Sequence, residues 1–294
     1  MNAFTIKDLE NLSGVKAHTI RIWEQRYSFL KPRRTATNIR YYSCDELKAI
    51  LNIALLNKYG FKISHIDRMC DTEMREKLIS LTHGEARTER IMNDLLHFMV
   101  DLDMHRFESL LNEQIAIRGI EKTISQLVFP FLEKIGILWL TNNINPAQEH
   151  LVTNIIRQKL MAGIENCEPD LCCTKTVVLF LPEGEHHELG LLYIHYLLKC
   201  RGIAVLYLGA NVPVKDLAFV ADLKKPAYFC THLTCVADNF NLTKWINNLS
   251  TLIPESRLIV SGNLTQSHHR KLPGNVELKR SLPQVIEFVQ AVSA

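Results

Sequence analysis

The chain has 294 residues, and the 47% of them that are hydrophobic are enough to fill two or three cores. The longest apolar stretches, 177–181 and 189–198, are shorter than the roughly 18 residues that a membrane-spanning helix needs, and the N-terminus has no signal-peptide pattern. We therefore expect a globular cytoplasmic protein without membrane contact, and a net charge of +3 is too small to indicate a partner by itself.

The cysteines are scattered along the chain, and no two of them form a CxxC pair. Their spacing predicts neither a zinc knuckle nor a disulfide framework. We expect small apolar fillers in a reducing compartment. The eight positions are Cys44, Cys70, Cys167, Cys172, Cys173, Cys200, Cys230 and Cys235.

The N-terminal segment concentrates positive charge on a pattern of two short helices. Thr5 can cap a helix whose apolar residues recur at helical spacing, and Gly14 interrupts it before a second helix that ends at Arg26. Two short helices joined by a tight glycine turn predict a helix-turn-helix. Between positions 16 and 42 seven basic residues stand against one acidic residue, so we expect an anionic partner.

The second helix and the segment after it carry the side chains expected to reach DNA. Ile20 and Trp23 suit the packing face of the helix, while Arg21 points elsewhere and is the best candidate for a base or phosphate contact. The run 29–42 contains Pro32 and β-favouring threonines, and predicts a basic hairpin that lies against phosphates or in the minor groove. The predicted DNA contacts are His18, Thr19, Arg21, Arg26, Arg33, Arg34, Arg40 and Tyr41.

A family resemblance rests on these same residues. RIWEQRY at 21–27, followed by KPRRTATNIRYYSCDEL at 31–47, resembles the DNA-binding domain of MerR-family transcription regulators. The resemblance implies a winged helix-turn-helix over residues 1–72 that binds pseudo-palindromic double-stranded DNA as a dimer. It also implies architectural roles for Trp23 and Glu24.

The middle of the chain is predicted to be a helical bundle over residues 80–166. Glycine and proline are sparse there, and apolar residues recur at helical spacing, as between Leu95 and Leu102. Asn145 before Pro146 is a helix start, because the amide side chain can cap and proline fits the first helical position. The proline-containing segment 166–174 is expected to be a linker.

Short β-rich runs alternate with helical patterns from residue 174 to residue 294. The runs TVVLFLP, IAVLYLG, AYFCTHL, RLIVSG and VELKR predict a parallel sheet covered on both faces. With five strands the leading candidate is the flavodoxin-like (Rossmann-like) order 2-1-3-4-5, whose ligand crevice lies beyond the carboxyl ends of strands 1 and 3. The loop after strand 1 is EGEHHELG, 183–190, and the loop after strand 3 should face it.

The EGEHHELG loop allows several kinds of chemistry. A histidine there can ligate a metal through one ring nitrogen while the other donates to a carboxylate, and Glu185 stands two residues before His187. A zinc site held by protein alone needs three or four ligands, and only His186, His187 and the glutamates are local. A hydrolase would need a nucleophile elbow, which the sequence lacks. A solvated loop at a helix start stays open as the plain alternative.

A second resemblance narrows these alternatives. Glu185-x-His187-x-x-Gly190 resembles the DxHxxG signature of cobalamin-binding domains, and Thr231-His232-Leu233 and Ser261-Gly262 stand where that family has SxL and GG. The departures are glutamate for aspartate, threonine for serine and serine for the first glycine. The resemblance implies that His187 is the lower cobalt ligand, and that Glu185, Gly190, Thr231, Leu233, Ser261 and Gly262 bind the cofactor.

The bundle carries a third motif. Trp139, followed by nine residues and then Glu149 and His150, resembles the Wx9EH motif of light-sensing cobalamin repressors of the CarH/LitR type. The resemblance implies a cap in which Trp139 packs against the adenosyl group of adenosylcobalamin, with methylcobalamin as the other candidate form. Leu140 stands where that family has a second histidine, and the bis-histidine photoproduct is therefore not implied.

The three segments together predict a multidomain α and α/β protein. Its domains are a winged helix-turn-helix (1–72), a helical-bundle cap (80–166) and an α/β cobalamin-binding domain (174–294). The predicted function is a cobalamin-controlled transcriptional repressor, without catalysis, that self-associates as a dimer or tetramer and releases DNA after photolysis. The alternatives are a corrinoid protein for methyl transfer and a cofactor-independent regulator controlled by protein partners.

Overall fold

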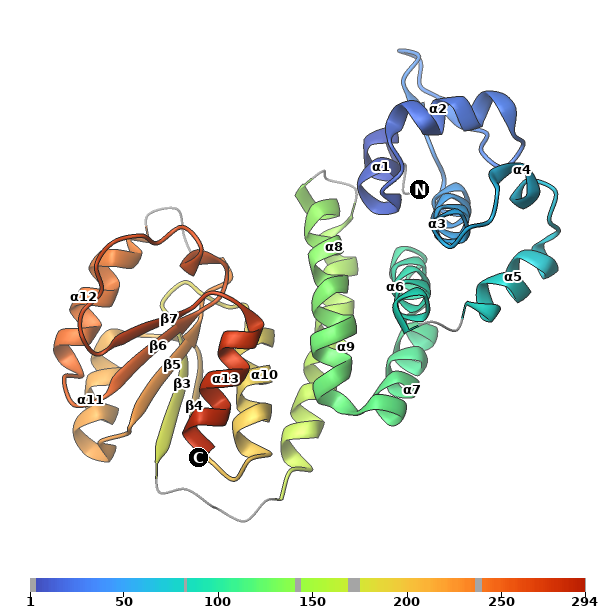
Figure 1. Ribbon diagram of the computed structural model, residues 1–294. Helices are drawn as coiled ribbons and strands as arrows, with labels where there is room; N and C mark the ends of the chain where they lie inside the picture. The colour runs from blue at the N-terminus through green and yellow to red at the C-terminus, as the bar shows by residue number, and fades with distance from the viewer. Residues whose placement is uncertain (1–3, 82–83, 141–143, 169–174, 236–239, 294) are drawn as a thin grey trace. The chain divides into compact units, whose positions relative to one another are not determined.

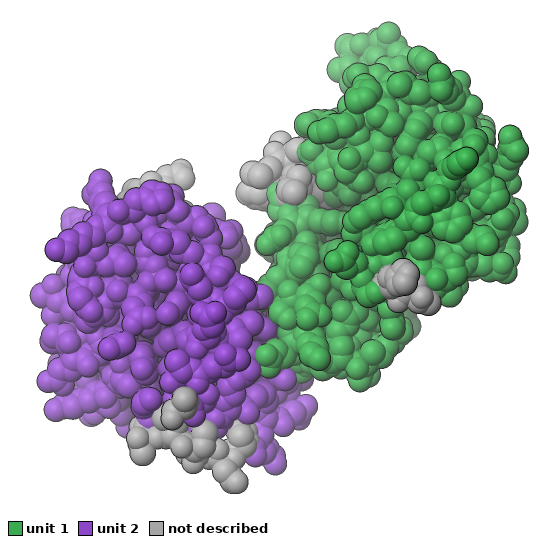
Figure 2. All heavy atoms as spheres, in the orientation of Figure 1, with its two compact units in different colours: residues 1–155 green, residues 156–294 purple. Residues whose placement is uncertain are grey.

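The computed structural model describes residues 4–81, 84–140, 144–168, 175–235 and 240–293, with only the backbone for 137–140. The chain forms two compact units, residues 1–155 and residues 156–294, which Figure 1 draws as ribbons and Figure 2 as space-filling bodies. Among the described residues, no helix combines the length and the apolar character needed to cross a membrane.

The winged helix-turn-helix is the first part of unit 1. Its elements are α1 (Ile6–Ser13), α2 (Ala17–Arg26), β1 (Arg33–Arg34), β2 (Arg40–Tyr41), α3 (Cys44–Lys58), α4 (Ile63–Ile66) and α5 (Asp71–Ser80). Thr5 caps α1 as predicted, in a box where Thr5 and Asp8 bond each other's backbone N–H. Gly14 ends α1 in the left-handed region at φ 73°, and β1 pairs antiparallel with β2. The prediction of two helices and a hairpin is confirmed.

A helical bundle follows the winged helix-turn-helix, and the boundary between the two units falls within its last helix. It consists of α6 (Gly84–Val100), α7 (Met104–Thr123), the π-helical turn η1 (Ile124–Val128), α8 (Phe129–Leu140) and α9 (Pro146–Glu165). The predicted start of α9 is confirmed, since Asn145 Oδ1 accepts from Ala147 N at 2.9 Å. Gly119, at φ 78°, interrupts the helical geometry inside α7, which the periodicity did not predict.

Unit 2 is a parallel sheet with helices on both faces. Its elements are β3 (Thr176–Pro182), α10 (Leu189–Lys199), β4 (Ala204–Val212), α11 (Val214–Lys224), β5 (Tyr228–His232), α12 (Leu242–Leu252), β6 (Arg257–Ser261), η2 (Asn263–Thr265), β7 (Val276–Lys279) and α13 (Leu282–Ser293). The order β4-β3-β5-β6-β7 confirms the predicted 2-1-3-4-5 arrangement. In Figure 1, α10 and α13 lie on one face and α11 and α12 on the other.

The core of the α/β domain lies between the sheet and its helices. Val178, Phe229 and Leu258 are aligned on three neighbouring strands and pack with Leu249 of α12. Residues of the strands alternate between the two faces, so Thr231 lies on the α12 side and His232 on the α10 side of β5. The carboxyl ends of β3, β5 and β6 therefore meet at one edge, where a ligand crevice is expected.

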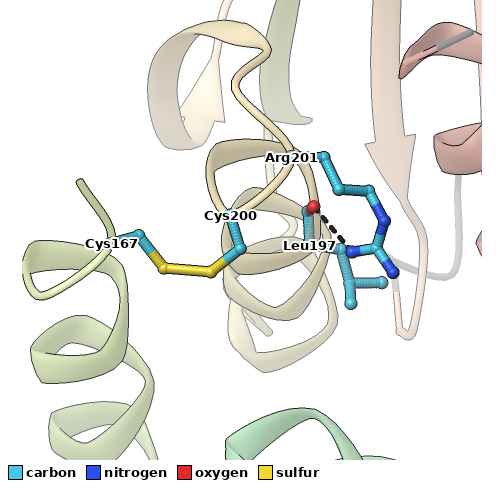
Figure 3. Close-up of a disulfide and its surroundings, with 4 residues drawn as sticks. All are labelled: Cys167, Leu197, Cys200 and Arg201. Atoms are coloured by element: carbon cyan, nitrogen blue, oxygen red, sulfur yellow. Dashed lines mark hydrogen bonds between the residues drawn. A yellow bond between two sulfur atoms is a disulfide. The ribbon is translucent and has the colours of Figure 1, made fainter. Parts of the chain in front are cut away.

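The structure contains a disulfide that the spacing of the cysteines did not predict. Cys167, just after α9, is bonded to Cys200 at the end of α10, 33 residues further along the chain (Figure 3). Beside it, Arg201 donates to the Leu197 carbonyl at 2.9 Å and satisfies part of the C-terminal end of α10. The prediction that the cysteines are only fillers is wrong for this pair, because tertiary packing brings their Cα atoms to 5.3 Å.

Candidate functional site

The exposed face of α2 is the first candidate surface. Ile20 is fully buried and Trp23 nearly so, which fixes how the helix is rotated against the rest of the domain. His18, Arg21 and Gln25 are consequently exposed on the opposite side. The helix therefore presents a donor-rich face of the kind that reaches base edges or phosphates in a major groove.

The wing adds further basic side chains. Arg33 and Arg34 of β1 are exposed, and Arg34 Nη1 donates to Asn38 Oδ1 at 2.7 Å across the turn. Arg34 stands directly opposite Arg40 of β2. Like charges in facing positions destabilise a hairpin, so this arrangement favours an anionic partner for the wing.

Glu24 ties the wing to α2. Its carboxylate accepts from Arg40 Nε at 3.0 Å and from the Tyr42 hydroxyl. Tyr42 is fully buried, and burial, reinforced by the hydrogen bond to Glu24, raises the pKa of its hydroxyl. Arg40 is therefore half-buried in an ion pair that holds the wing, and any DNA contact it makes is added to that structural bond.

Glu185 is the centre of the second candidate site, in the loop after β3. Its side chain is 0% exposed. Oε1 accepts from the backbone N–H groups of His186 and His187, each at 2.9 Å. Oε2 accepts from the N–H groups of Thr234 and Cys235 at 2.8 and 2.7 Å. The loops after β3 and β5 thus meet at this carboxylate, as the predicted topology requires.

These donors also keep Glu185 ionised. Burial by itself raises the pKa of a carboxyl group, but the hydrogen bonds from His187 and from the backbone outweigh it and hold the pKa of Glu185 below its usual value. An ionised carboxylate only accepts hydrogen bonds. The Nδ1 atom of His187, 2.7 Å from Oε1, therefore carries the proton.

The tautomer of His187 follows from this bond. With the proton on Nδ1, the neutral ring has its lone pair on Nε2, which is the form that ligates a metal. The His187 side chain is 55% exposed. His186 is also exposed, and its backbone N–H donates to Glu185 Oε1.

The ends of β5 and β6 border the expected crevice. Thr231 is fully buried, and its Oγ1 has no hydrogen-bond partner within the described residues. Ser261 Oγ donates to the Thr231 carbonyl at 3.0 Å, and Leu233 N donates to the Ser261 carbonyl at 2.8 Å. Gly262 has φ 97°, and a Cβ there would lie 2.2 Å from the Leu233 carbonyl oxygen. Only glycine fits that position.

Two side chains in this region were missed by sequence reasoning. His232, the middle residue of the β5 motif, packs against Gly190 and bonds Ser261. Glu188, directly after His187, accepts from the Tyr207 hydroxyl at 3.0 Å. His232 is the middle residue of a motif whose two flanking residues were predicted to bind the cofactor, so the sequence did contain a signal for it. Nothing in the sequence pairs Glu188 with a tyrosine 19 residues away.

The predicted cap residues lie in the bundle. Gln148 is buried, and its Nε2 donates to the Val100 carbonyl at 2.9 Å, which fixes the rotation of α9. Glu149 and His150 follow it and turn away from this contact; Glu149 is half-buried and His150 exposed. Trp139 belongs to α8, but its side chain lies outside the described residues.

Other parts of the described chain offer no competing centre. A groove of about 620 Å³ beside α6 and α7 is lined by Arg87, Arg118 and Met92, and includes no predicted cofactor residue. Over the residues that the structure describes, no three or more histidine, cysteine, aspartate or glutamate side chains are grouped to hold a metal ion.

Comparison with protein families matches two segments of the chain. Residues 4–73 match the model of the MerR HTH family regulatory protein, and residues 91–162 match the model of the B12 binding domain. The chain joins a MerR-type helix-turn-helix to a B12-binding domain. The second match coincides with the helical bundle, which carries Glu149 and His150.

Two curated proteins from Myxococcus xanthus are similar to this chain. One is the HTH-type transcriptional repressor CarH, 27% identical over 275 residues, which are 90% of each protein. The other is the HTH-type transcriptional repressor CarA, 27% identical over 214 residues, which cover 72% of this chain and 70% of that protein. The resemblance to CarH/LitR-type repressors is thus supported along almost the whole chain.

A solved structure shares the fold. The monomethylamine corrinoid protein of Methanosarcina barkeri superposes with a TM-score of 0.56 and 13% identity, covering 70% of this chain and 99% of that one. At this identity the match shows a common fold alone.

Proposed function

We propose that this protein is a DNA-binding transcriptional repressor whose self-association and operator binding are controlled by bound cobalamin. The observation that carries the proposal is the buried carboxylate of Glu185 on the Nδ1 of His187, in a chain that also has a basic winged helix-turn-helix. The similarity to two repressors supports the same role. The proposal includes a cytoplasmic location, because a repressor has to reach its operator.

The DNA-binding half of the proposal rests on α2 and the wing. Arg21, Arg33 and Arg34 are exposed on these elements. A single winged domain covers one half-site, so a pseudo-palindromic operator requires a dimer or a larger assembly of even number. The proposed contacts remain His18, Thr19, Arg21, Arg26, Arg33, Arg34, Arg40 and Tyr41.

The residues around the crevice fit a corrinoid. His187 has the tautomer of a metal ligand. Within the described residues, the Thr231 hydroxyl at the end of β5 is a buried polar group without a hydrogen-bond partner. Adenosylcobalamin, when bound, supplies a cobalt–carbon bond that light can break. In this proposal His187 would hold the cobalt. The proposed pocket residues are Glu185, Gly190, Thr231, Leu233, Ser261 and Gly262. The proposed cap residues are Trp139, Glu149 and His150.

Light is the proposed signal. Illumination of the loaded protein is expected to dissociate the oligomer and free the DNA, with no substrate turnover. A leucine side chain cannot ligate a metal, so in this proposal position 140 supplies no second ligand after illumination. Methylcobalamin is the other candidate form.

Reconstitution in the dark tests the proposal. Purified full-length protein mixed with adenosylcobalamin is expected to retain corrinoid absorbance through gel filtration. His187→Ala should lose the spectrum of a histidine-ligated corrinoid, whereas His186→Ala, the matched control in the same loop, should keep it. A wild-type protein that elutes without corrinoid refutes the cofactor assignment.

The alternatives give different results in the same experiment. A corrinoid protein for methyl transfer would retain the cofactor but show no salt-dependent DNA binding. A regulator controlled by protein partners would bind DNA without any corrinoid. Unchanged oligomer size after illumination of the loaded protein would refute light as the signal.

A further inference from the structure

His232 fills the space that Gly190 leaves at the start of α10. A Cβ on Gly190 would lie 2.3 Å from Cδ2, 2.6 Å from Nε2 and 2.8 Å from Cγ of the His232 ring. No side chain larger than hydrogen fits at position 190 while His232 keeps this rotamer. The imidazole therefore lies flush against the helix, between α10 and the sheet.

A hydrogen-bond chain holds the ring in this place. The only hydroxyl proton of Ser261 goes to the Thr231 carbonyl, 3.0 Å away. Ser261 Oγ therefore accepts from His232 Nδ1, at 2.9 Å. The lone pair of His232 is then on Nε2, the ring atom nearest to Gly190 after Cδ2.

The charge state of the ring agrees with this tautomer. Burial lowers the pKa of His232 to about 4, and the nearby Glu185 carboxylate opposes the shift only in part. The imidazole is neutral at physiological pH. It is thus an uncharged and partly apolar plug, which an incoming apolar or hydrogen-bonding group can replace without removing a charge.

The position of the plug coincides with the proposed binding residues. His232 contacts two of them, Gly190 and Ser261, and its chain neighbours Thr231 and Leu233 are two more. The loop after β5, which starts at the next residues, is tied to Glu185. The His232 ring therefore occupies the space between Gly190 of α10 and Ser261 of β6.

We propose that His232 is a specificity-determining gate: its imidazole closes the inner crevice between Gly190 and Ser261, and it has to swing out before the lower nucleotide of a corrinoid can enter. The nature of the ligand rests on the proposed function, whereas the closure rests on the packing alone. A corrinoid without a nucleotide does not need this space. His232 therefore slows complete corrinoids and not truncated ones.

Association kinetics test the gate. Full-length protein is mixed in the dark with adenosylcobalamin or with adenosylcobinamide, which lacks the nucleotide, and the change in absorbance is followed by stopped flow. Opening the gate breaks one neutral hydrogen bond, so His232→Ala should speed adenosylcobalamin association by about 2- to 10-fold and leave adenosylcobinamide unchanged. His186→Ala is the control and should change neither rate. Equal acceleration of both corrinoids, or of neither, overturns the gate.

A second measurement needs no cofactor. Gly190→Ala should lower the thermal unfolding midpoint of the unliganded protein, because the new methyl group collides with the ring. Adding His232→Ala should recover part of that loss, since the ring is then absent. If the two losses simply add, His232 does not fill the space and the gate is wrong. A wild-type protein that binds neither corrinoid refutes the proposed function, and this cycle then decides the closure by itself.

Discussion

Replacing Glu185 by glutamine tests how much of the candidate site depends on one buried carboxylate. Both oxygens of Glu185 act as hydrogen-bond acceptors. Oε1 accepts from the N–H groups of His186 and His187 and from His187 Nδ1. Oε2 accepts from the N–H groups of Thr234 and Cys235. An amide places its own NH2 group on one of these sides. At least two donors then lose their acceptor, whichever way the amide turns.

The expected loss of stability follows from those two donors. An unpaired buried donor costs about 1–3 kcal/mol. Cys235 is exposed and Thr234 half-buried, so water can reach this side and the lower end applies. We expect Glu185→Gln to lower the free energy of unfolding of the α/β domain by about 2 kcal/mol.

The pH dependence gives the same argument a sign. The pKa of Glu185 is held below its reference value of 4.5 in the folded protein. The carboxylate therefore contributes stability above that reference value, and the contribution is lost as the pH falls through the lowered folded pKa. The difference between wild type and Glu185→Gln should be full at neutral pH and shrink in acid.

Urea unfolding at neutral pH and at about pH 3.5 measures both effects. Glu183→Gln is the matched control, because it makes the same change on an exposed residue of the same loop. Hydrogen exchange should also show faster exchange of the Thr234 and Cys235 amides in Glu185→Gln. If Glu185→Gln loses no more stability than Glu183→Gln, the carboxylate does not hold the two loops together.

Two further predictions concern the DNA interface and the disulfide. Arg21→Glu should weaken operator binding and reduce the slope of log affinity against log salt by about 1. Lys215→Glu on α11 makes an equal charge change on an exposed residue of unit 2 and should change neither quantity. An unchanged affinity and slope for Arg21→Glu would show that Arg21 does not contact DNA. Reduction of the Cys167–Cys200 bond, which spans 33 residues, should cost about 3–4 kcal/mol through the larger entropy of the unfolded chain. Thermal unfolding with and without reductant measures this loss. Reductant should leave the unfolding midpoint of Cys167→Ser unchanged, whereas it should lower the midpoint of Cys235→Ser as much as that of wild type. Equal midpoints of oxidised and reduced wild type would contradict the prediction.

Local patterns in the sequence were sufficient for the elements. Thr5 and Asn145 lie at helix starts because a cap needs only the next few residues. The strand order of unit 2 also followed from the alternation of β-rich and helical segments, since right-handed crossovers leave few arrangements for five parallel strands. The kink at Gly119 was missed because glycine is compatible with both a helix and its interruption.

In the candidate site, too, the sequence predicted the local contacts but not the contacts between distant residues. Glu185 and His187 were paired from the sequence because they are two residues apart on one loop, and the structure has that hydrogen bond. That the β5 loop faces them followed from topology. The exact acceptor for its N–H groups did not, because Glu185 and Cys235 are 50 residues apart and the pleat and loop conformation decide which amides point inward.

The sequence by itself determined the helix-turn-helix with its wing, the helical bundle, the order of the parallel strands and the loop that bears His187. Only the tertiary structure decided that Arg40 is bound to Glu24, that Cys167 is bonded to Cys200 and that His232 closes the space beside Gly190. The physical reason is common to the three pairs. Periodicity and caps act over one or two turns of chain, whereas the distance between residues far apart in sequence is set by how whole elements pack.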